Sequence, residues 1–263
     1  MIAPWNAPAG VGRLIAPNER KAGLQSSRDA LISFAAVAAT WQAASLVLPK
    51  FQVPGLQYVF HSLLTLRYDY VLISLTRVVL ALGVSFLLGL ACAIAMYIYQ
   101  NVERFFMPIV RLAMAVPATC WIVFSILWFK GVELRITFVL IVCCAPIFLV
   151  DMLDGIRGIP RDLRDMMWSF RPGLTHFLWM LVLPAITPVI LTSFKINLSQ
   201  AIRLVTFAEL VGAVSGIGYG LNVAEELFSV ADVFAWTVVL IVILTLAMEA
   251  LSWVESRLLR WRP

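Results

Sequence analysis

Long runs of apolar residues, separated by short polar segments, dominate the pattern of this sequence. The runs lie at Ala30 to Leu48, Val71 to Tyr99, Met107 to Phe129, Ile136 to Met152, Phe177 to Leu204 and Val233 to Val254. Each is close to the roughly 20 residues that an α-helix needs to cross a bilayer. The pattern therefore predicts an all-α, polytopic integral membrane protein with about six transmembrane helices.

Several prolines fall inside these runs. Pro117, Pro146, Pro184 and Pro188 are expected to punctuate the helices without ending them. In a membrane, neighbouring helices can satisfy the backbone carbonyls that a proline leaves free.

The chain divides into a short N-terminal tail and one membrane domain. Residues 1–28 are rich in Pro, Gly and Arg and lack the apolar core of a secretory signal, so they are expected to stay in the cytoplasm. The transmembrane domain is expected to cover residues 29–263. Within it, the moderately apolar stretch 49–70 fits an interfacial helix on the outer surface and a packed connector equally well.

Composition and charge agree with a membrane location. Hydrophobic residues make up 62% of the chain, against roughly 45–50% in soluble domains. The net charge of +5 comes from Lys and Arg gathered before the first run, in the central polar segment and at the C-terminus. Positive loops stay on the cytoplasmic side, so both termini and the central segment are expected there, near anionic lipid headgroups. Nucleic-acid binding is not expected.

The central polar segment, residues 155–176, carries the pattern of a short amphipathic helix. Pro160 suits the first turn of a helix, and Pro172-Gly173 should end it. An apolar stripe follows helical spacing at Leu163, Met166, Met167 and Phe170. From periodicity alone, a helix that lies on the lipid headgroups is as well supported as one that docks a partner.

Spacing in this segment resembles a known motif. Asp165-Met166-Met167, then Arg171, then Leu181-Val-Leu-Pro184 resemble the EAA loop of binding-protein-dependent ABC importer permeases. The pattern of that loop is Glu-Ala-Ala, three residues, Gly, nine residues, Ile, any residue and Leu-Pro. Further motifs are similar in order and spacing to the nitrate, sulfonate and taurine branch: Ser74-Leu-Thr-Arg77, Val116-Pro117, Leu127-Trp-Phe129, Gly155-Ile-Arg157, Ala208-Glu209 and Ser215-Gly-Ile-Gly-Tyr219. The resemblance extends from about Tyr70 to the C-terminus.

The resemblance implies a type I importer permease fold and a coupling role for the central segment. The residues expected to contact an ATPase are Asp165, Met166, Met167, Ser169, Phe170, Arg171 and Gly173. Two departures stand out: methionines replace two small alanines, and Arg171 replaces the glycine of the turn. Because glycine accepts positive φ readily, either Gly173 takes over the bend or the loop differs locally.

The same resemblance implies the partners. A second permease copy, forming a homodimer, two ATP-binding subunits and a separate solute-binding protein are expected, in a bacterial cytoplasmic (inner) membrane. No Gly-x-x-x-x-Gly-Lys-Ser/Thr segment occurs here, so ATP and Mg are expected on the partner ATPase and no cofactor on this chain. The chain is therefore expected to be a permease subunit and not an enzyme.

Polar residues in the fifth run are candidates for the solute path. Helical spacing places Ser193, Asn197 and Gln200 on one face, and Lys195, Ser199, Arg203 and Thr206 on another. A positive face suits an anionic solute such as nitrate or a sulfonate. An equally supported alternative pairs Lys195 with a carboxylate on another helix and lets Arg203 reach the outer headgroups.

Residues near the expected outer ends of the spans are assigned three different roles. Glu209, Gly216, Gly218 and Tyr219 are candidates for an outer gate, whereas Arg77 is interpreted as structural. Trp128 and Trp236 are expected to be interfacial anchors.

Other classes of function fit the sequence less well. The four cysteines lie in apolar runs without metal-ligand spacing, and His61 and His176 are isolated, so neither a metal site nor an enzyme is indicated. An importer of a non-anionic nutrient remains an alternative. An ion-coupled secondary transporter needs more central acids, and a membrane scaffold would use the central helix to dock a signalling partner.

Overall fold

A computed structural model describes residues 32–33, 35–36, 38–47, 49 and 52–259. The chain separates into two compact units, residues 1–60 and 61–263. In the first unit, the described residues between 32 and 47 are helical, and the Trp41 indole N–H donates to the Pro54 carbonyl oxygen at 3.0 Å. The predicted first span falls partly outside the described residues.

Helices account for the architecture of the second unit. In chain order the helices are α2 (Leu56–Thr65, which contains the boundary between the units), α3 (Asp69–Ile98), α4 (Gln100–Ala115), α5 (Ala118–Trp128), α6 (Val132–Arg157), α7 (Arg161–Ser169), α8 (Leu174–Phe177), the π-helical turn η1 (Leu178–Val182), α9 (Leu183–Gly212), α10 (Ile217–Glu226) and α11 (Val230–Leu258). No strand occurs among the described residues, as the apolar pattern predicts.

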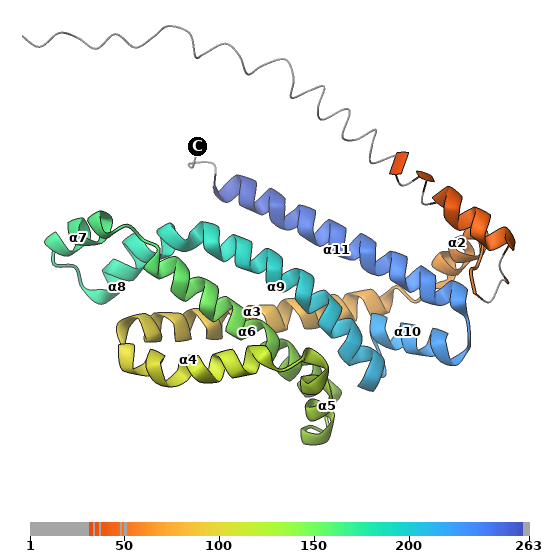
Figure 1. Cartoon of the computed structure of the whole chain (residues 1–263), viewed down its shortest axis with the longest axis horizontal. Helices are drawn as coiled ribbons and strands as arrows, with labels where there is room; N and C mark the ends of the chain where they lie inside the picture. Colours follow the sequence, from red (N-terminus) through yellow and green to blue (C-terminus); the bar gives the residue numbers. More distant parts are fainter. Residues whose placement is uncertain (1–31, 34, 37, 48, 50–51, 260–263) are drawn as a thin grey trace, which may run out of the picture. The chain divides into compact units, whose positions relative to one another are not determined.

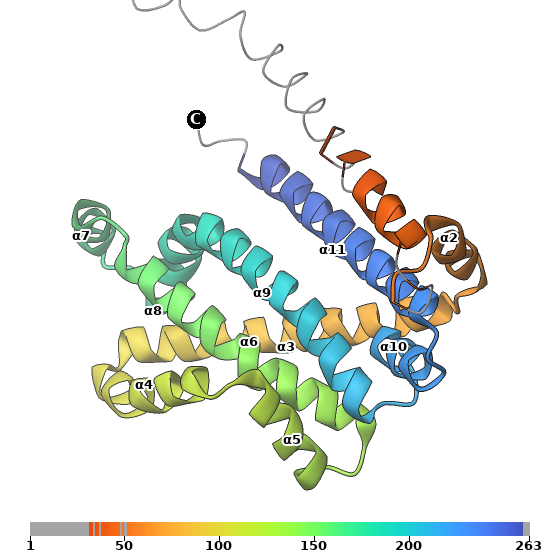
Figure 2. The ribbon, with the colours of Figure 1, turned by 45° about the vertical axis from the view of Figure 1, so that its right-hand side comes forward.

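Three long helices, α3, α6 and α9, form the core of this unit (Figures 1 and 2). Val139, Phe148 and Met152 of α6 are fully buried, and the Phe148 ring contacts Phe86 of α3 and Phe194 of α9. Gly89 of α3 permits the close approach, since a Cβ there would lie 2.6 Å from the Cβ of Phe148. The core is thus built around α6, where both α3 and α9 pack.

Four described helices are long and apolar enough to cross a membrane. They are Asp69–Ile98, Val132–Arg157, Leu174–Gly212 and Val230–Leu258, and the last is mostly exposed within this single chain. They match four of the six predicted spans. The bent pair α4 and α5 counts as a fifth span if both helices form one crossing.

The pair α4 and α5 corrects the prediction for Pro117. Instead of one helix from Met107 to Phe129, α4 ends at Ala115 and α5 begins at Ala118, with a 98° bend between them. Val116 is extended (ψ 127°), the conformation that a residue before proline prefers. Pro117 therefore ends a helix, whereas Pro146 and Pro188 lie inside α6 and α9 as predicted.

Pro184 is accommodated by a π-helical turn. The segment from Leu174 to Gly212 runs as one span of 39 residues, in which η1 comes just before Pro184. A π-turn adds a residue to the helical repeat and frees the backbone from the usual pattern where proline has no N–H to donate. The predicted start of this span, Phe177, lies three residues inside it.

Candidate functional site

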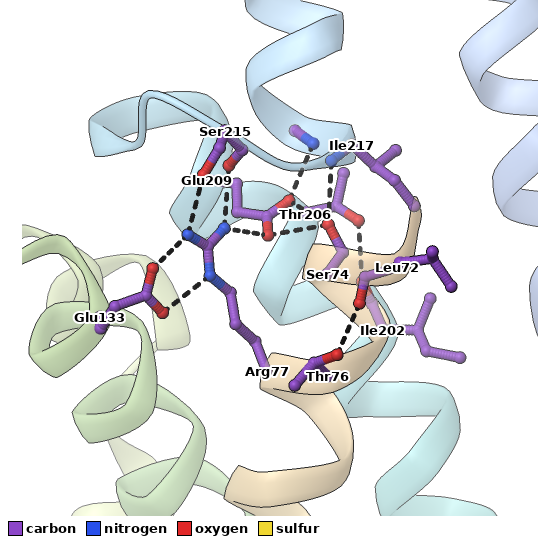
Figure 3. A network of polar contacts seen from close by, with 11 residues as sticks. Leu72, Ser74, Thr76, Arg77, Glu133, Ile202, Thr206, Glu209, Ser215 and Ile217 are labelled. Carbon is purple, nitrogen blue, oxygen red and sulfur yellow. Dashed lines mark hydrogen bonds and ion pairs between the residues drawn. The ribbon is translucent and has the colours of Figure 1, made fainter. Parts of the chain in front are cut away.

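A network of polar contacts centres on the buried Arg77 of α3 (Figure 3). Its Nη1 donates to Oε1 of Glu209 at 2.7 Å and to the carbonyl oxygen of Ser215 at 2.8 Å. Its Nε and Nη2 donate to the two carboxylate oxygens of Glu133, at 2.9 and 2.5 Å, and Nη2 also donates to Oγ of Ser215 at 3.1 Å. These bonds use all five N–H groups of the guanidinium.

Glu209 joins this network to the N-terminus of α10. Its Oε2 accepts from the backbone N–H of Gly218 at 3.0 Å, and the Ser74 hydroxyl donates to both carboxylate oxygens, at 2.8 and 2.7 Å. The Ser74 hydroxyl in turn accepts from the N–H of Ile217 at 2.9 Å. First-turn N–H groups have no partner inside their own helix, and a carboxylate there is favoured by the helix dipole.

Two glycines make room for this carboxylate. Gly216 has φ +109°, and a Cβ on it would lie 2.3 Å from Oε1 of Glu209. A Cβ on Gly218 would lie 2.1 Å from the carbonyl oxygen of Thr206. Only glycine therefore lets α10 start directly against α9.

The network ties together four helices, α3, α6, α9 and α10. It brings together three of the predicted gate residues, Glu209, Gly216 and Gly218, around Arg77, which the sequence analysis interprets as structural. Tyr219 points to a neighbouring aromatic cluster, where its ring lies 5.8 Å from that of Tyr70.

Trp236 belongs to the same aromatic cluster. It is buried, its ring stacks on Tyr70 at 6.2 Å, and a Cβ on Gly220 would lie 2.6 Å from its indole. The prediction of Trp236 as an interfacial anchor is therefore wrong, because α10 covers the indole. Trp128 is exposed, as an anchor must be.

The two polar faces of α9 have different surroundings. Ser193 and Asn197 are buried in the bundle, and the Ser193 hydroxyl donates to Oδ2 of Asp151 at 2.5 Å. On the other face, Lys195 pairs with Glu255 of α11. Arg203 is exposed and donates to the carbonyl oxygen and hydroxyl of Ser199 at 3.0 and 3.1 Å, and it forms no ion pair within the described part of the chain.

The pairing of Lys195 is the one that the alternative interpretation predicted. Gln200 is half-buried and Thr206 is buried, with its hydroxyl donating to the carbonyl oxygen of Ile202 at 2.8 Å.

A cavity of about 650 Å³ lies between α6 and α9 near the start of α7. Asp151, Asp154, Gly155, Pro160 and Pro188 are among its lining residues. The two carboxylates give this cavity a negative character.

The amphipathic helix α7 stands out from the bundle (Figure 1). It begins after Pro160, as predicted, and none of its residues is buried. Met166 and Phe170 of the predicted apolar stripe are exposed, whereas Met167 packs against the core. Trp168 stacks on Phe177 at 5.2 Å and so attaches α7 to the start of the long span.

Arg171 itself makes the turn after α7. Its φ is +49°, in the left-handed region, and its N–H donates to the carbonyl oxygen of Trp168 at 2.9 Å. Gly173 has φ −66° and precedes α8, so it does not take over the bend. The arginine adopts a left-handed conformation that glycine accepts most readily, and Pro172 follows it as prolines commonly follow such helix ends.

Comparison with known proteins identifies the family. Residues 85–260 match the family described as the binding-protein-dependent transport system inner membrane component. The chain belongs to this family. This match, together with the related permeases described next, confirms the predicted resemblance to ABC importer permeases of the nitrate, sulfonate and taurine branch.

Three related permeases are similar over most of their length. The taurine transport system permease protein TauC of Escherichia coli is 28% identical over 234 residues, which cover 84% of each chain. The putative aliphatic sulfonates transport permease protein SsuC of Bacillus subtilis is 26% identical and covers 74% of this chain and 71% of its own. The bicarbonate transport system permease protein CmpB of Synechococcus elongatus is 22% identical, with 71% and 68% covered.

A solved structure shows the same fold. The MetNI methionine ABC transporter in an inward-facing conformation includes a chain that matches with a TM-score of 0.63 at 15% identity. The match covers 72% of this permease and 94% of that chain. The predicted type I importer permease fold is confirmed.

Sequence reasoning missed part of the Arg77 network. Glu133 was not a candidate, and Ser74 and Ser215 appeared only within motifs. A signal was present: Ser74 and Arg77 lie three residues apart, on one face of a helix, in a run that is otherwise apolar. Among the described residues, no cluster of His, Cys, Asp and Glu could hold a metal ion.

Proposed function

We propose that this permease forms the translocation path for a small anionic solute and is driven by a separate ATPase that docks on α7. The observation that carries the proposal is the exposed apolar face of α7, on a helix attached to a membrane span. Relatives named as taurine, sulfonate and bicarbonate permeases support the class of solute.

The docking role rests on what each apolar residue of α7 contacts. Met167 and Trp168 hold the helix to the bundle, through the core and through Phe177. Met166, Leu163 and Phe170 stay exposed, the last to 77%. An exposed cluster of large apolar residues on a charged helix is typical of an interaction surface. Motion of a docked partner would reach the long span through the Trp168 and Phe177 rings.

The solute path is best supported on the Arg203 face of α9. Arg203 and Ser199 supply positive charge and hydrogen-bond groups that no described carboxylate neutralises. Ser193 and Asn197 instead lie in the packed interface with α6. Anions are favoured along a positive surface, so Arg203, Ser199 and Gln200 are the stronger path candidates, with Lys195 partly neutralised by Glu255.

Membership of the family supports an assembly of several subunits. We propose two copies of this permease, two ATP-binding subunits that carry ATP and Mg, and an external solute-binding protein, in a bacterial inner membrane with both termini cytoplasmic. Glu209, Gly216, Gly218 and Tyr219 would then lie at the outer end of the path, on the opposite side from α7.

A second candidate function is import of a non-anionic nutrient. The cavity lined by Asp151 and Asp154 would repel an anion and suit a cationic or neutral solute. This candidate is supported by a relative named as the formylaminopyrimidine transport permease protein ThiX, since that name does not specify an anionic solute.

Substitution of the exposed face of α7 tests the docking role. Met166→Glu and Phe170→Glu place charges where the partner's apolar groove must meet the helix, which costs affinity because the charge is desolvated on binding. We expect copurification with the ATPase and solute-stimulated ATP hydrolysis in proteoliposomes to fall at least about tenfold.

The matched control is Leu227→Glu, an exposed apolar residue after α10. It should leave copurification unchanged. Equal membrane expression and elution volume of all three variants would show that the permease is folded. Full stimulation in both α7 variants would contradict the docking role.

A further inference from the structure

We propose that the Nε and Nη2 edge of Arg77 is an anion-binding site, occupied in this structure by Glu133 and taken by the carboxylate or sulfonate group of a solute when Glu133 swings away. The inference rests on the proposed function, since it names a place where an anionic solute binds. It assigns Glu133 as an internal occupant of that place.

The two edges of the Arg77 guanidinium bind carboxylates that differ in solvent exposure. The Nη1 edge meets Glu209, whose side chain is completely buried. Removal of Glu209 would leave the N–H of Gly218 and the Ser74 hydroxyl without their acceptor. The Nε and Nη2 edge meets Glu133, whose side chain is 68% exposed. Among the described residues Glu133 makes no hydrogen bond other than those to Arg77, so its departure would free only the Nε and Nη2 edge of the guanidinium.

Exchange of one anion for another preserves the charge and the hydrogen bonds of this site. Arg77 with Glu133 and Glu209 carries one positive and two negative charges. If Glu133 left without a replacement, two N–H groups of a 5% exposed arginine side chain would lose their acceptors. A planar guanidinium edge bonds two oxygens of one oxyanion side by side, as it does with Glu133 here. The site therefore requires an oxyanion and discriminates against neutral molecules.

Space for a small solute lies directly beside this edge. A cavity of about 480 Å³ is lined by Arg77 and Glu133 together with Thr76, Thr137, Leu72 and Leu80. This size and a mostly apolar lining with a few polar groups are typical of small-molecule sites. The Thr76 hydroxyl, which donates to the Leu72 carbonyl oxygen, keeps acceptor capacity, and the leucines would contact the carbon atoms of a short organic anion.

The inference is tested by direct binding to the purified full-length permease, with methanesulfonate as the anionic probe and methanesulfonamide as its neutral counterpart. Glu133→Gln weakens the internal competitor, because an amide offers one neutral acceptor to the guanidinium edge in place of two charged oxygens. We expect this variant to bind methanesulfonate at least about tenfold more tightly than the unaltered permease. Methanesulfonamide should gain nothing.

Two further variants locate the effect. Thr137→Leu fills the cavity and should weaken methanesulfonate binding in the Glu133→Gln background without touching Arg77. Glu103→Gln removes a carboxylate from a different ion pair, that with Arg157, and should leave the affinity unchanged. Thermal melts of each variant verify the fold.

Equal affinity of the unaltered permease and Glu133→Gln for methanesulfonate would overturn the inference, as would an equal gain for methanesulfonamide. This readout needs no ATPase. Failure here with intact coupling at α7 would remove only the anion site, whereas anion binding with failed coupling would remove only the proposed docking role.

Discussion

The Arg77 network and the α7 helix are opposite solutions to the placement of polar and apolar groups. Around Arg77, the guanidinium and the Glu209 carboxylate are inside the bundle, Glu133 lies at its surface, and every guanidinium N–H has an acceptor. On α7, large apolar side chains are outside, and no described part of the chain covers Met166 and Phe170. The first region is complete within this chain, whereas the second is, by our proposal, completed by a docked partner.

This difference indicates which part of the permease is rigid and which part can move when a partner binds. The buried pair of Arg77 and Glu209 holds α3 and α9 to each other and to the start of α10, since breaking it costs several kcal/mol. An exposed helix held by two residues can respond to what binds it. The same long span contacts both regions, with Phe177 at one end and Glu209 at the other.

Removal of Glu209 is the strongest way to break the complete region. Glu209→Ala leaves Arg77 buried beside one remaining carboxylate and orphans the N–H of Gly218, so we expect the unfolding free energy to fall by about 3–5 kcal/mol. Thermal unfolding in detergent measures the loss. The control Glu225→Ala, an exposed carboxylate of α10, should change the melting temperature little; an equal loss in both would refute the special role of Glu209.

Glycine-to-alanine substitutions, which add one methyl group, should have the next largest effect and should differ between the two regions. Gly218→Ala places a Cβ 2.1 Å from the Thr206 carbonyl oxygen, so α10 must move, at a cost of about 2–3 kcal/mol. Gly173→Ala, beside α7, meets nothing within 4 Å and has a negative φ, so it should be neutral. Melting temperatures of the two variants compare the regions directly, and similar values would show that α10 is not tightly packed.

Substitution of Arg171 should have the smallest effect, and it should stabilise the protein where the preceding substitutions destabilise it. A left-handed backbone costs a non-glycine residue about 1–2 kcal/mol, so Arg171→Gly should stabilise the turn after α7 by about 1 kcal/mol. Hydrogen exchange of the Arg171 amide, which bonds the Trp168 carbonyl, should slow. Arg171→Ala keeps the strain and should show no slowing; equal rates in both variants would mean that the turn is not strained.

The sequence predicted the membrane class, four of the long spans and the start of α7, because these depend on local apolar patterns. Pro117 escaped prediction because the same residue type continues a helix at Pro146 and ends one at Pro117. The surrounding helices decide between the two outcomes. For the bend after α7, the sequence left two alternatives, a turn at Gly173 or a local change in the loop. The preference of glycine for positive φ indicates which residue adopts that conformation at least cost, but it does not determine which residue adopts it in this loop.

The candidate site was predicted only in part for a different reason. Arg77 meets Glu133 and Glu209 across 56 and 132 positions of the chain, and no local pattern pairs residues so far apart. The partners of Lys195 and Ser193 likewise lie on other helices. In a bundle of long helices, position along each helix can be read from the sequence, whereas the rotation of one helix against another depends on packing.

The length of α9 gives it the properties of a lever. Its 30 residues extend about 45 Å, well beyond the roughly 30 Å thickness of the hydrocarbon layer. A tilt of about 10° around its middle would shift each end by about 4 Å, in opposite directions. A displacement of the end near α7 would thus produce a displacement of Glu209 in the opposite direction, and the bending stiffness of the helix would set its size.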